Sequence, residues 1–320
     1  MSKYAYVVGA CSKYVPELCA LLNSLDYVGN TQDFHLIGID MPEDFTEQFD
    51  LLGFKVIHHV ISKEEIEAAH GISEITCRKR YWYAATIGQD YSAVCILDAD
   101  LIFNRDPIQF FNIAEKTGYI LGPCKEQNKV YDDEHQEVDG KWIIERGFYN
   151  DKDLCNSPVF IDARVWKDPL MKSWDIFLNH GYKAPDMDAM NMCFLEAGAY
   201  DKIIKLAGLQ WLGTNEQMLK PYIRAVERHG KLFNECGPEI FCYHGHYAHK
   251  RWRECQLDNR HNCAEGYLKA SGNSDNMARG AMDLLYGNFK KMLFGTIKLR
   301  PSNYRHPELD IKEDYGELWG

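Results

Sequence analysis

The N-terminal part of the chain alternates between short apolar runs and segments whose apolar residues recur with helical spacing. The apolar runs lie at 4–10, 34–39, 54–61 and 93–97. The helical spacing lies at 16–25, at 63–70 and from about 75 to 87. This order predicts an α/β fold with a mostly parallel central sheet flanked by helices. Because the predicted strands are apolar throughout rather than alternating, both faces of the sheet should be covered.

The rest of the chain is less regular. Short strands are predicted at 119–122, 159–161 and 240–243, with a helix at 189–197. The polar stretch 125–153 has little periodicity and is long enough to form a functional loop or flap. Residues 230–240 resemble a loop, and residues 283–300 are predicted to form a last helical or extended stretch.

Composition narrows the class of protein. The 320 residues are 46% hydrophobic and 26% charged, which is typical of a globular chain and excludes disorder. The net charge of −11 opposes binding of bulk nucleic acid, although a local basic patch could still bind it. No apolar run is long enough for a transmembrane helix or a signal-peptide core. The eleven cysteines are scattered without a CxxC pair, so we expect reduced thiols in a cytoplasmic protein.

The strongest local signal is the segment ILDADLIF at 96–103. Asp98 and Asp100 follow a buried-type strand directly, at the end where open α/β sheets place their ligands. In extended backbone, residues two apart point the same way, so both carboxylates could bind one cation. Oxygen ligands suit magnesium or manganese. The alternative is a turn-capping aspartate followed by a solvated one.

A second signal is the histidine-rich segment FCYHGHYAHKRW at 241–252. His244, His246 or His249 could supply a nitrogen ligand to the same metal ion. Lys250 could neutralise a diphosphate, and Trp252 could form a wall of the pocket. The alternative is a surface loop that happens to be rich in histidine.

Two further segments carry polar groups beside predicted elements. In APDMDAMNMCF at 184–194, Asp186, Asp188 and Asn191 could bond to sugar hydroxyls, although helix capping is an equally simple interpretation. In NSPVFID at 156–162, Asn156 and Ser157 precede a short strand and could contact a sugar or the metal's water shell. A plain turn is the alternative there.

Taken in order, these four segments resemble the motifs of the retaining glycosyltransferases of family 8, the group of glycogenin and the lipooligosaccharide galactosyltransferases. ILDAD is similar to that family's (Y/F)(L/M)DxD, and DMDAMN is similar to DQDxLN with Met187 in place of Gln. NSPVFI resembles NSG(V/L)xx(I/L), with Pro158 in place of Gly. The histidine segment resembles HxxGxxKPW, with Tyr247 at the Gly position and Arg251 at the Pro position. The resemblance covers roughly residues 3–255, and four motifs in sequence order rarely arise by chance.

The resemblance implies a GT-A, Rossmann-like catalytic domain at 1–255, with a donor half at about 1–160 and an acceptor half at about 160–255. Residues 256–320 would form a C-terminal extension that could contact the acceptor or a membrane surface. The implied metal ligands are Asp98, Asp100 and His244, binding manganese or, alternatively, magnesium. The implied contacts to the nucleotide-sugar donor are Val8, Ala10, Cys11, Tyr14, Arg80, Asp98, Ala99, Asp100, Asn156, Ser157, Asp186, His244, Tyr247, Lys250 and Trp252.

The implied activity is metal-dependent transfer of a hexose, from a UDP-sugar or a similar nucleotide-sugar, to a glycan or another hydroxyl acceptor with retention of configuration. Asp186, Asp188 and Asn156 are the candidate catalytic residues. Two alternatives stay open: a nucleotide-sugar- or carbohydrate-binding protein with weak catalysis, and a nucleotidyltransferase-like enzyme. The latter usually has a Gly- and Lys-rich phosphate loop, which GACSKY at 9–14 lacks.

Three other stretches have weaker interpretations. TCRKRYWY at 76–83 carries Arg80, which lies 18 residues ahead of Asp98, and could reach the donor or form a solvated basic helix face. Cys255 and Cys263, with His261 nearby, could bind zinc, but their spacing fits no common zinc pattern. NFKKMLFGTIKLR at 288–300 mixes basic and apolar residues, so it could lie on an anionic membrane or pack on the domain as a terminal helix.

Overall fold

A seven-stranded mixed sheet forms the centre of the protein. The computed structural model describes residues 2–67, 72–123, 154, 157–180, 186–206, 210–212, 225–229, 231–234, 239–244, 292 and 298–300. The sheet order is β3-β2-β1-β4-β7-β6-β8. Its strands are β1 (Tyr4–Cys11), β2 (Asp33–Ile39), β3 (Val56–Val60), β4 (Ala93–Leu97), β6 (Ile120–Gly122), β7 (Val159–Ile161) and β8 (Ile203–Lys205).

The predicted α/β architecture is confirmed. Strands β3, β2, β1 and β4 run parallel to one another, and β6 runs parallel to β8. Strand β7 is antiparallel to both of its neighbours, β4 and β6. The parallel strands β1 and β4 lie at the centre of the sheet, so their carboxyl ends meet at one edge, where the sequence predicts the site.

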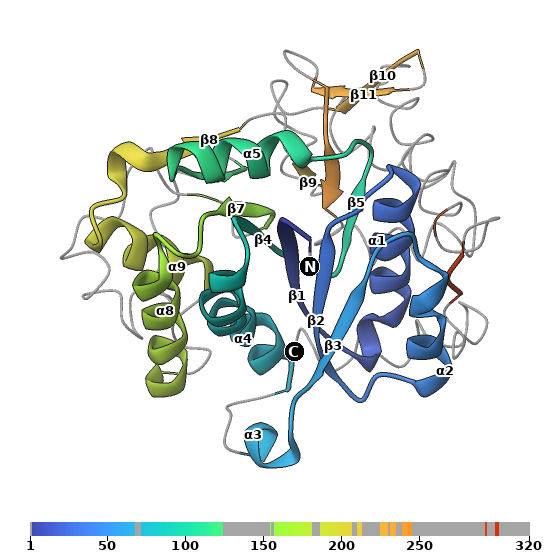
Figure 1. The fold of residues 1–320 in the computed structure, drawn as a ribbon, viewed down its shortest axis with the longest axis horizontal. Coiled ribbons are helices and arrows are strands. Elements are labelled where there is room, and N and C mark those ends of the chain that lie inside the picture. Colours follow the sequence, from blue (N-terminus) through green and yellow to red (C-terminus); the bar gives the residue numbers. More distant parts are fainter. Residues whose placement is uncertain are drawn as a thin grey trace, which may run out of the picture.

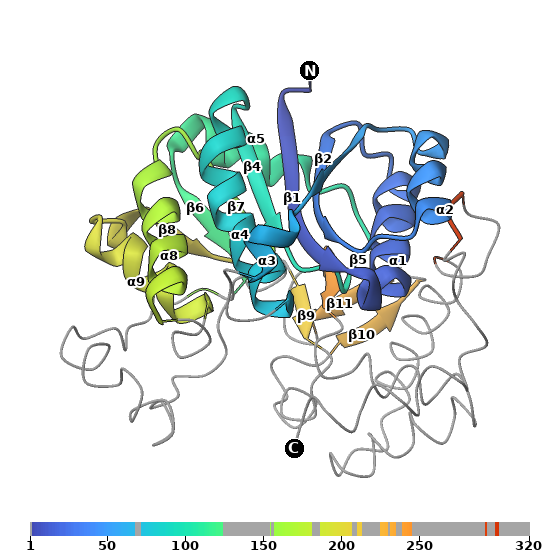
Figure 2. The same cartoon turned by 90° about the horizontal axis from the view of Figure 1, so that it is seen from below.

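Helices cover both faces of this sheet (Figures 1 and 2). One face carries α1 (Val15–Tyr27), α2 (Glu43–Thr46) and α5 (Ile108–Thr117). The other carries α3 (Lys63–Glu67), α4 (Ile72–Ile87), α8 (Lys167–His180) and α9 (Asp186–Glu196). Short 3-10 turns occur at η1 (Ser12–Tyr14), η2 (Glu47–Leu51), η3 (Gly88–Asp90) and η6 (Tyr200–Lys202). The described residues form two large apolar cores, one on each side of the sheet, and a small third cluster between α8 and α9.

Strand β1 shows why its run is apolar throughout. Alternate side chains point to opposite faces, so Tyr6 and Val8 enter the core with α1, whereas Ala5 and Val7 enter the core with α4. Gly9 lets α4 approach this strand closely, because an added Cβ there would lie 1.8 Å from the carbonyl oxygen of Thr76. The absence of a side chain at Gly9 therefore allows α4, and with it the side chains of α4, to lie close to β1.

Two small sheets are added to the central one. Strand β12 (Cys242–His244) lies between β5 (Leu101–Phe103) and β9 (Gln210–Leu212), and β10 (Ala225–Arg228) forms a hairpin with β11 (Lys231–Asn234). The predicted loop at 230–240 is therefore wrong over β11, whose four residues pair with β10. The sequence does not predict this pairing, because the apolar pattern of β11 is too short to be distinctive.

Helix and strand boundaries also differ from expectation. The helix predicted at 63–70 is described only as α3, Lys63–Glu67, and the longer helix begins at Ile72 instead of about residue 75. Helices α5 and α8 were not predicted, although both carry an apolar face. Among the described residues, no helix is long and apolar enough to cross a membrane.

The described C-terminal residues pack on α1. Asn23, which is buried, donates from Nδ2 to the carbonyl oxygens of Met292 and Leu299 at 2.6 and 3.0 Å, and its Oδ1 accepts the Leu299 N–H at 2.9 Å. Lys298 forms an ion pair with Asp26 at 3.0 Å. Two apolar residues of the stretch 288–300, Met292 and Leu299, are thus buried against the domain, as the alternative of packing on the domain predicts.

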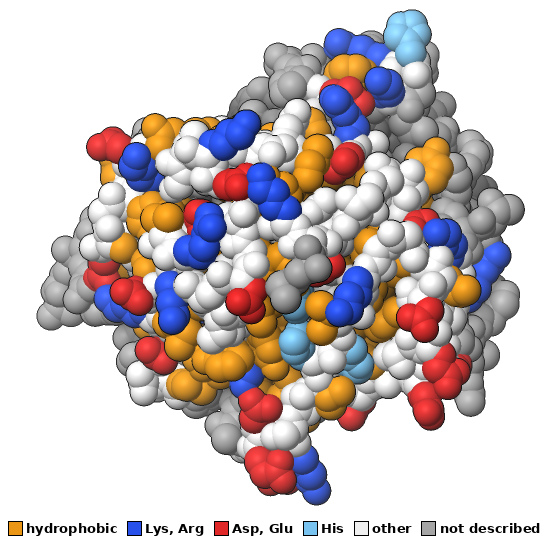
Figure 3. Space-filling view, in the orientation of Figure 1, with side chains coloured by type: hydrophobic (Ala, Val, Ile, Leu, Met, Phe, Trp, Pro, Cys, Tyr) orange, Lys and Arg blue, Asp and Glu red, His pale blue; other side chains and the backbone are white. Residues whose placement is uncertain are grey.

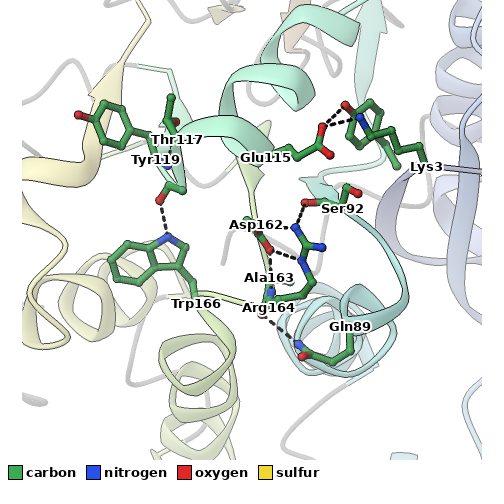
Figure 4. A network of polar contacts seen from close by, with 12 residues as sticks. Lys3, Gln89, Ser92, Glu115, Thr117, Tyr119, Asp162, Ala163, Arg164 and Trp166 are labelled. Atoms are coloured by element: carbon green, nitrogen blue, oxygen red, sulfur yellow. Dashed lines mark hydrogen bonds and ion pairs between the residues drawn. The ribbon is translucent and has the colours of Figure 1, made fainter.

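A network of polar contacts lies at the end of the sheet opposite to the predicted site (Figure 4). Arg164 donates from Nε and Nη2 to the two carboxylate oxygens of Asp162, at 2.9 and 2.7 Å, and Nη2 also reaches the Ser92 carbonyl oxygen at 3.1 Å. Trp166 donates from Nε1 to the carbonyl oxygen of Gly118 at 2.9 Å. These bonds tie the segment after β7 to the residues that precede β4 and β6.

A second buried network lies between β2, β3 and the start of β4. Nδ1 of His35 lies 2.8 Å from Nε2 of His59, and its Nε2 lies 2.9 Å from the Tyr91 hydroxyl, which donates to Asp33 at 2.9 Å. Histidine side chains reach the surface near β3, among hydrophobic ones (Figure 3). Burial, together with the nearby His59, lowers the pKa of His35 from 6.5 to about 4.

This network should make the protein less stable in acid. The folded chain holds His35 neutral, whereas the unfolded chain protonates it below about pH 6.5. Below that pH the unfolded state binds more protons than the folded state. The contribution of His35 to the free energy of unfolding is therefore fully present above about pH 6.5 and decreases as the pH falls toward 4. The lowering of the His35 pKa from 6.5 to about 4 corresponds to a loss of roughly 3 kcal/mol at most in the free energy of unfolding.

Urea unfolding between pH 7 and 4.5 measures this effect. The His35→Gln variant should lose less stability across that range than the unmodified chain, whatever its stability at pH 7. Equal losses for the two proteins would show that His35 is not the group responsible.

Candidate functional site

Asp98 and Asp100 lie where β4 ends, in the turn that leads to β5. The side chain of Asp98 is 20% exposed, and Asp100 is also partly exposed, whereas Ala99 between them is buried. The two aspartates therefore combine access to solvent with a backbone held by two buried strands. Such an environment leaves both carboxylates accessible to a cation.

Ser157 supports this turn from β7. Its side chain is fully buried, and its hydroxyl accepts the backbone N–H of Asp98 at 2.7 Å. The peptide bond between Ser157 and Pro158 is cis. The described contact of Ser157 is thus with the Asp98 backbone, which it holds in place.

Arg80 joins two carboxylates that are far apart in sequence. Its guanidinium is 1% exposed, donates to Asp98, and contacts Asp186 Oδ2 from Nη2 at 3.0 Å. Nη1 also donates to the carbonyl oxygen of Leu97 at 2.8 Å. A planar guanidinium can serve several acceptors at once, which a lysine cannot do in the same geometry. Arg80 therefore links the end of β4 to the start of α9.

The basic stretch around Arg80 is not a solvated helix face. Arg78, Lys79 and Arg80 are all buried, so that alternative is wrong. Arg78 lies over the ring of Phe177 at 5.1 Å, and Lys79 pairs with Glu65. Packing of α4 between β1 and α8 removes these side chains from water, and each is matched by a carboxylate, a carbonyl or a ring.

Asp186 is the first residue of α9, and donors surround its carboxylate. Besides Arg80, the hydroxyl of Tyr81 lies 3.3 Å from Oδ2, and Oδ1 accepts the N–H of Met187 at 2.8 Å. Tyr81 belongs to the stretch TCRKRYWY but is not among the site residues predicted from the sequence. Its position directly after Arg80 is the only sequence signal that could have identified it.

Asn191 has a structural role. Its side-chain amide pairs with Leu154, accepting the backbone N–H at 3.0 Å and donating to the carbonyl at 2.9 Å. It also donates to the Met187 carbonyl oxygen at 2.9 Å, and its side chain is buried. The expected bond from Asn191 to a sugar hydroxyl is therefore wrong, because this amide already pairs with the backbone.

Strand β12 brings the backbone of His244 to the aspartates. His244 pairs with Leu101, the residue that follows Asp100, in antiparallel register. The side chain of His244 lies outside the described residues, and among those described no group of three His, Cys, Asp or Glu side chains is arranged to hold a metal. The donor set of two carboxylates and one imidazole suits manganese, and magnesium would use the oxygens.

The candidate donor contacts in the N-terminal strand are mostly buried. Val8, Ala10 and Cys11 lie in the two cores, so only their backbone is available to a ligand at the end of β1. Tyr14 is partly buried and packs against both cores. Of these four residues, Tyr14 is the one with an accessible ring that a nucleotide base could contact.

Several candidates lie outside the described residues. They are Asn156, His246, Tyr247, His249, Lys250, Trp252, and the possible zinc ligands Cys255, His261 and Cys263. Asp188 lies in α9, but its side chain is not described. The described site consequently consists of Arg80, Tyr81, Asp98, Asp100 and Asp186, with Ser157 and the His244 backbone beside them.

Neither protein-family models nor curated sequences match the chain. Among solved structures, the galactosyltransferase LgtC in complex with donor and acceptor sugar analogs matches with a TM-score of 0.55 and 16% identity, over 84% of this chain and 95% of that one. An active-site mutant of LgtC matches with a TM-score of 0.56 and 15% identity, over 87% and 99%. The chain therefore has the GT-A-like fold of these galactosyltransferases, as its resemblance to family 8 implied.

Proposed function

We propose that this protein is a glycosyltransferase that transfers a hexose from a nucleotide-sugar to a hydroxyl acceptor such as a glycan. One observation carries this proposal: Arg80 joins Asp98, at the carboxyl end of a central parallel strand, to Asp186, at the start of α9. That edge of an open α/β sheet is where ligands bind. The fold shared with a galactosyltransferase that binds donor and acceptor sugar analogs supports the same interpretation.

Asp98, Asp100 and His244 would hold a divalent cation, manganese or magnesium. When bound, the cation would neutralise negative charge on the diphosphate leaving group. The described residues fit this role, because Asp98 and Asp100 are partly exposed on a fixed turn and the His244 backbone lies one residue away along the ladder. Ser157 keeps the turn in place through the N–H of Asp98.

Asp186 is better suited to holding a sugar hydroxyl than to attacking the anomeric carbon. Arg80 and Tyr81 contact one of its oxygens, and the Met187 N–H contacts the other. Hydrogen bonds to a carboxylate stabilise its charge and lower its nucleophilicity. We therefore favour retention by front-face attack of the acceptor, with a donor phosphate oxygen taking the proton, and a positioning role for Asp186.

The donor is proposed to be a UDP-sugar. Its base would contact the end of β1, where Tyr14 offers a partly exposed ring beside the backbone of Cys11. Its diphosphate would then face the end of β4, which pairs with β1 in parallel register, Val8 opposite Leu97. In this arrangement the phosphates would lie beside Asp98 and the sugar toward Asp186, which Arg80 joins to Asp98.

Thermal unfolding in the presence of UDP and Mn²⁺ tests the proposal. Ligand binding to the folded state raises its stability by about 2.7 kcal/mol at a ligand concentration of 100 times Kd. We expect a rise in Tm of several degrees with UDP and Mn²⁺ together, and little change with either alone. A screen for hydrolysis of common UDP-sugars would then identify the hexose.

The same measurements distinguish the alternatives. Metal-independent stabilisation by sugar alone would indicate a carbohydrate-binding protein. Release of pyrophosphate from a nucleoside triphosphate, without hydrolysis of any nucleotide-sugar, would indicate a nucleotidyltransferase. Either result would overturn the transferase assignment.

A further inference from the structure

Tyr81 is a buried tyrosine whose hydroxyl points at the proposed site. Its side chain is 1% exposed, and its hydroxyl lies 3.3 Å from Oδ2 of Asp186. Arg80, the preceding residue on α4, donates to the same oxygen at 3.0 Å. Adjacent residues on a helix point about 100° apart, so these two side chains approach the carboxylate from different directions.

Arg80 and Tyr81 differ in what else they contact. Arg80 also donates to Asp98 and to the Leu97 carbonyl oxygen, so its position depends on β4 and on whatever Asp98 binds. Tyr81 donates to Asp186, and its ring lies 5.3 Å from the Arg80 guanidinium, so the two side chains also contact each other. Burial and the adjacent Asp186 charge raise the pKa of Tyr81 well above its ordinary value, so the hydroxyl stays protonated and remains a donor.

We propose that Tyr81 is a positioning residue for the sugar end of the site, which fixes the orientation of the Asp186 carboxylate together with Arg80 and the Met187 N–H. This inference rests on the proposed function, which assigns Asp186 to the donor sugar. The Met187 N–H holds Oδ1, and Arg80 and Tyr81 hold Oδ2, so removing the Tyr81 hydroxyl takes away one of the two described donors that restrict Oδ2. Tyr81 should therefore affect turnover of the sugar and not binding of the nucleotide.

The Tyr81→Phe variant tests this by removing one oxygen atom. We expect kcat/KM for sugar transfer to fall about tenfold, the effect typical of losing one hydrogen bond to a charged group. The stabilisation by UDP and Mn²⁺ should stay the same within about twofold in apparent affinity, because the lost contact lies at the sugar end.

Tyr91→Phe is the matched control. The Tyr91 hydroxyl also donates to a carboxylate, that of Asp33 at 2.9 Å, but at the opposite end of the sheet. Both variants lose a buried bond between a hydroxyl and a carboxylate, so both should lower Tm, whereas only Tyr81→Phe should lower turnover. Equal turnover in the two variants would overturn the proposal.

A double-mutant cycle with Asp186→Asn separates positioning from a general loss of stability. If Tyr81 acts through Asp186, Tyr81→Phe should change turnover less than about twofold in the Asp186→Asn background. A full tenfold effect in that background would refute the inference and leave the proposed function intact. If the unmodified protein neither binds UDP with Mn²⁺ nor hydrolyses a nucleotide-sugar, the proposed function itself fails, and this inference fails with it.

Discussion

Replacing Asp98 with asparagine is expected to lower the rate of sugar transfer at least about a hundredfold. Asparagine keeps the shape of the side chain and an oxygen that can accept from Arg80, so the fold should be retained. It removes the negative charge that the cation needs, and amide oxygens bind divalent cations more weakly than carboxylates do. Initial rates measured over a range of Mn²⁺ concentrations would show both the lower rate and a higher Mn²⁺ requirement.

Asp50→Asn provides the control for this experiment. Asp50 is an exposed aspartate in η2, and its replacement changes the net charge equally. Its turnover and Mn²⁺ requirement should equal those of the unmodified protein. If Asp98→Asn turned over at full rate, or if a chelator left turnover unchanged, the proposed metal site would be wrong.

Replacing Arg80 with methionine is expected to lower the free energy of unfolding by about 2–3 kcal/mol. The guanidinium is almost fully buried, and its loss leaves Asp98 and Asp186 without the charge that lies between them. Removing one partner of a fully buried pair costs about 3–5 kcal/mol, but these carboxylates keep 20% and 24% exposure, which reduces the effect. Urea unfolding of the two proteins at pH 7 measures the difference.

Arg105→Met is the matched variant. Arg105 pairs with Glu239 at 2.9 Å, but its side chain is 46% exposed, so its loss should cost less than about 1 kcal/mol. Mn²⁺ should restore part of the stability lost in Arg80→Met, since a cation held by Asp98 replaces the missing charge. An Arg80→Met protein as stable as Arg105→Met would contradict the bridging role.

Local sequence patterns were sufficient for six of the seven strands of the central sheet, all but β8, and for the place of Asp98 and Asp100 at its edge. Strands β1 and β4 are apolar runs flanked by polar residues, and such runs predict buried parallel strands whatever surrounds them. The position of Asp98 and Asp100 follows from this, because the residues after a buried strand lie at the sheet edge. The place of Asp186 at a helix start was likewise indicated by Pro185 and by the apolar spacing of α9.

The partners of these residues depend on contacts between distant segments, which no local pattern contains. From the sequence alone, Arg80 cannot be distinguished from a solvated basic residue. Its burial depends on the packing of α4 on β1, where the absence of a side chain at Gly9 leaves room for the Thr76 backbone. Asn191 resembled a sugar ligand, but its amide pairs with Leu154, 37 residues away.

The spacing of apolar residues along a helix or strand indicates which of its faces is buried, because burial follows the hydrophobicity of residues that are close in sequence. Which polar groups meet depends on how the helices and strands pack. Asp98, Ser157, Arg80, Tyr81 and Asp186 come together only because β4, β7, α4 and α9 converge at one edge of the sheet. Hydrogen bonds and ion pairs form over about 3 Å, a distance that sequence separation does not predict.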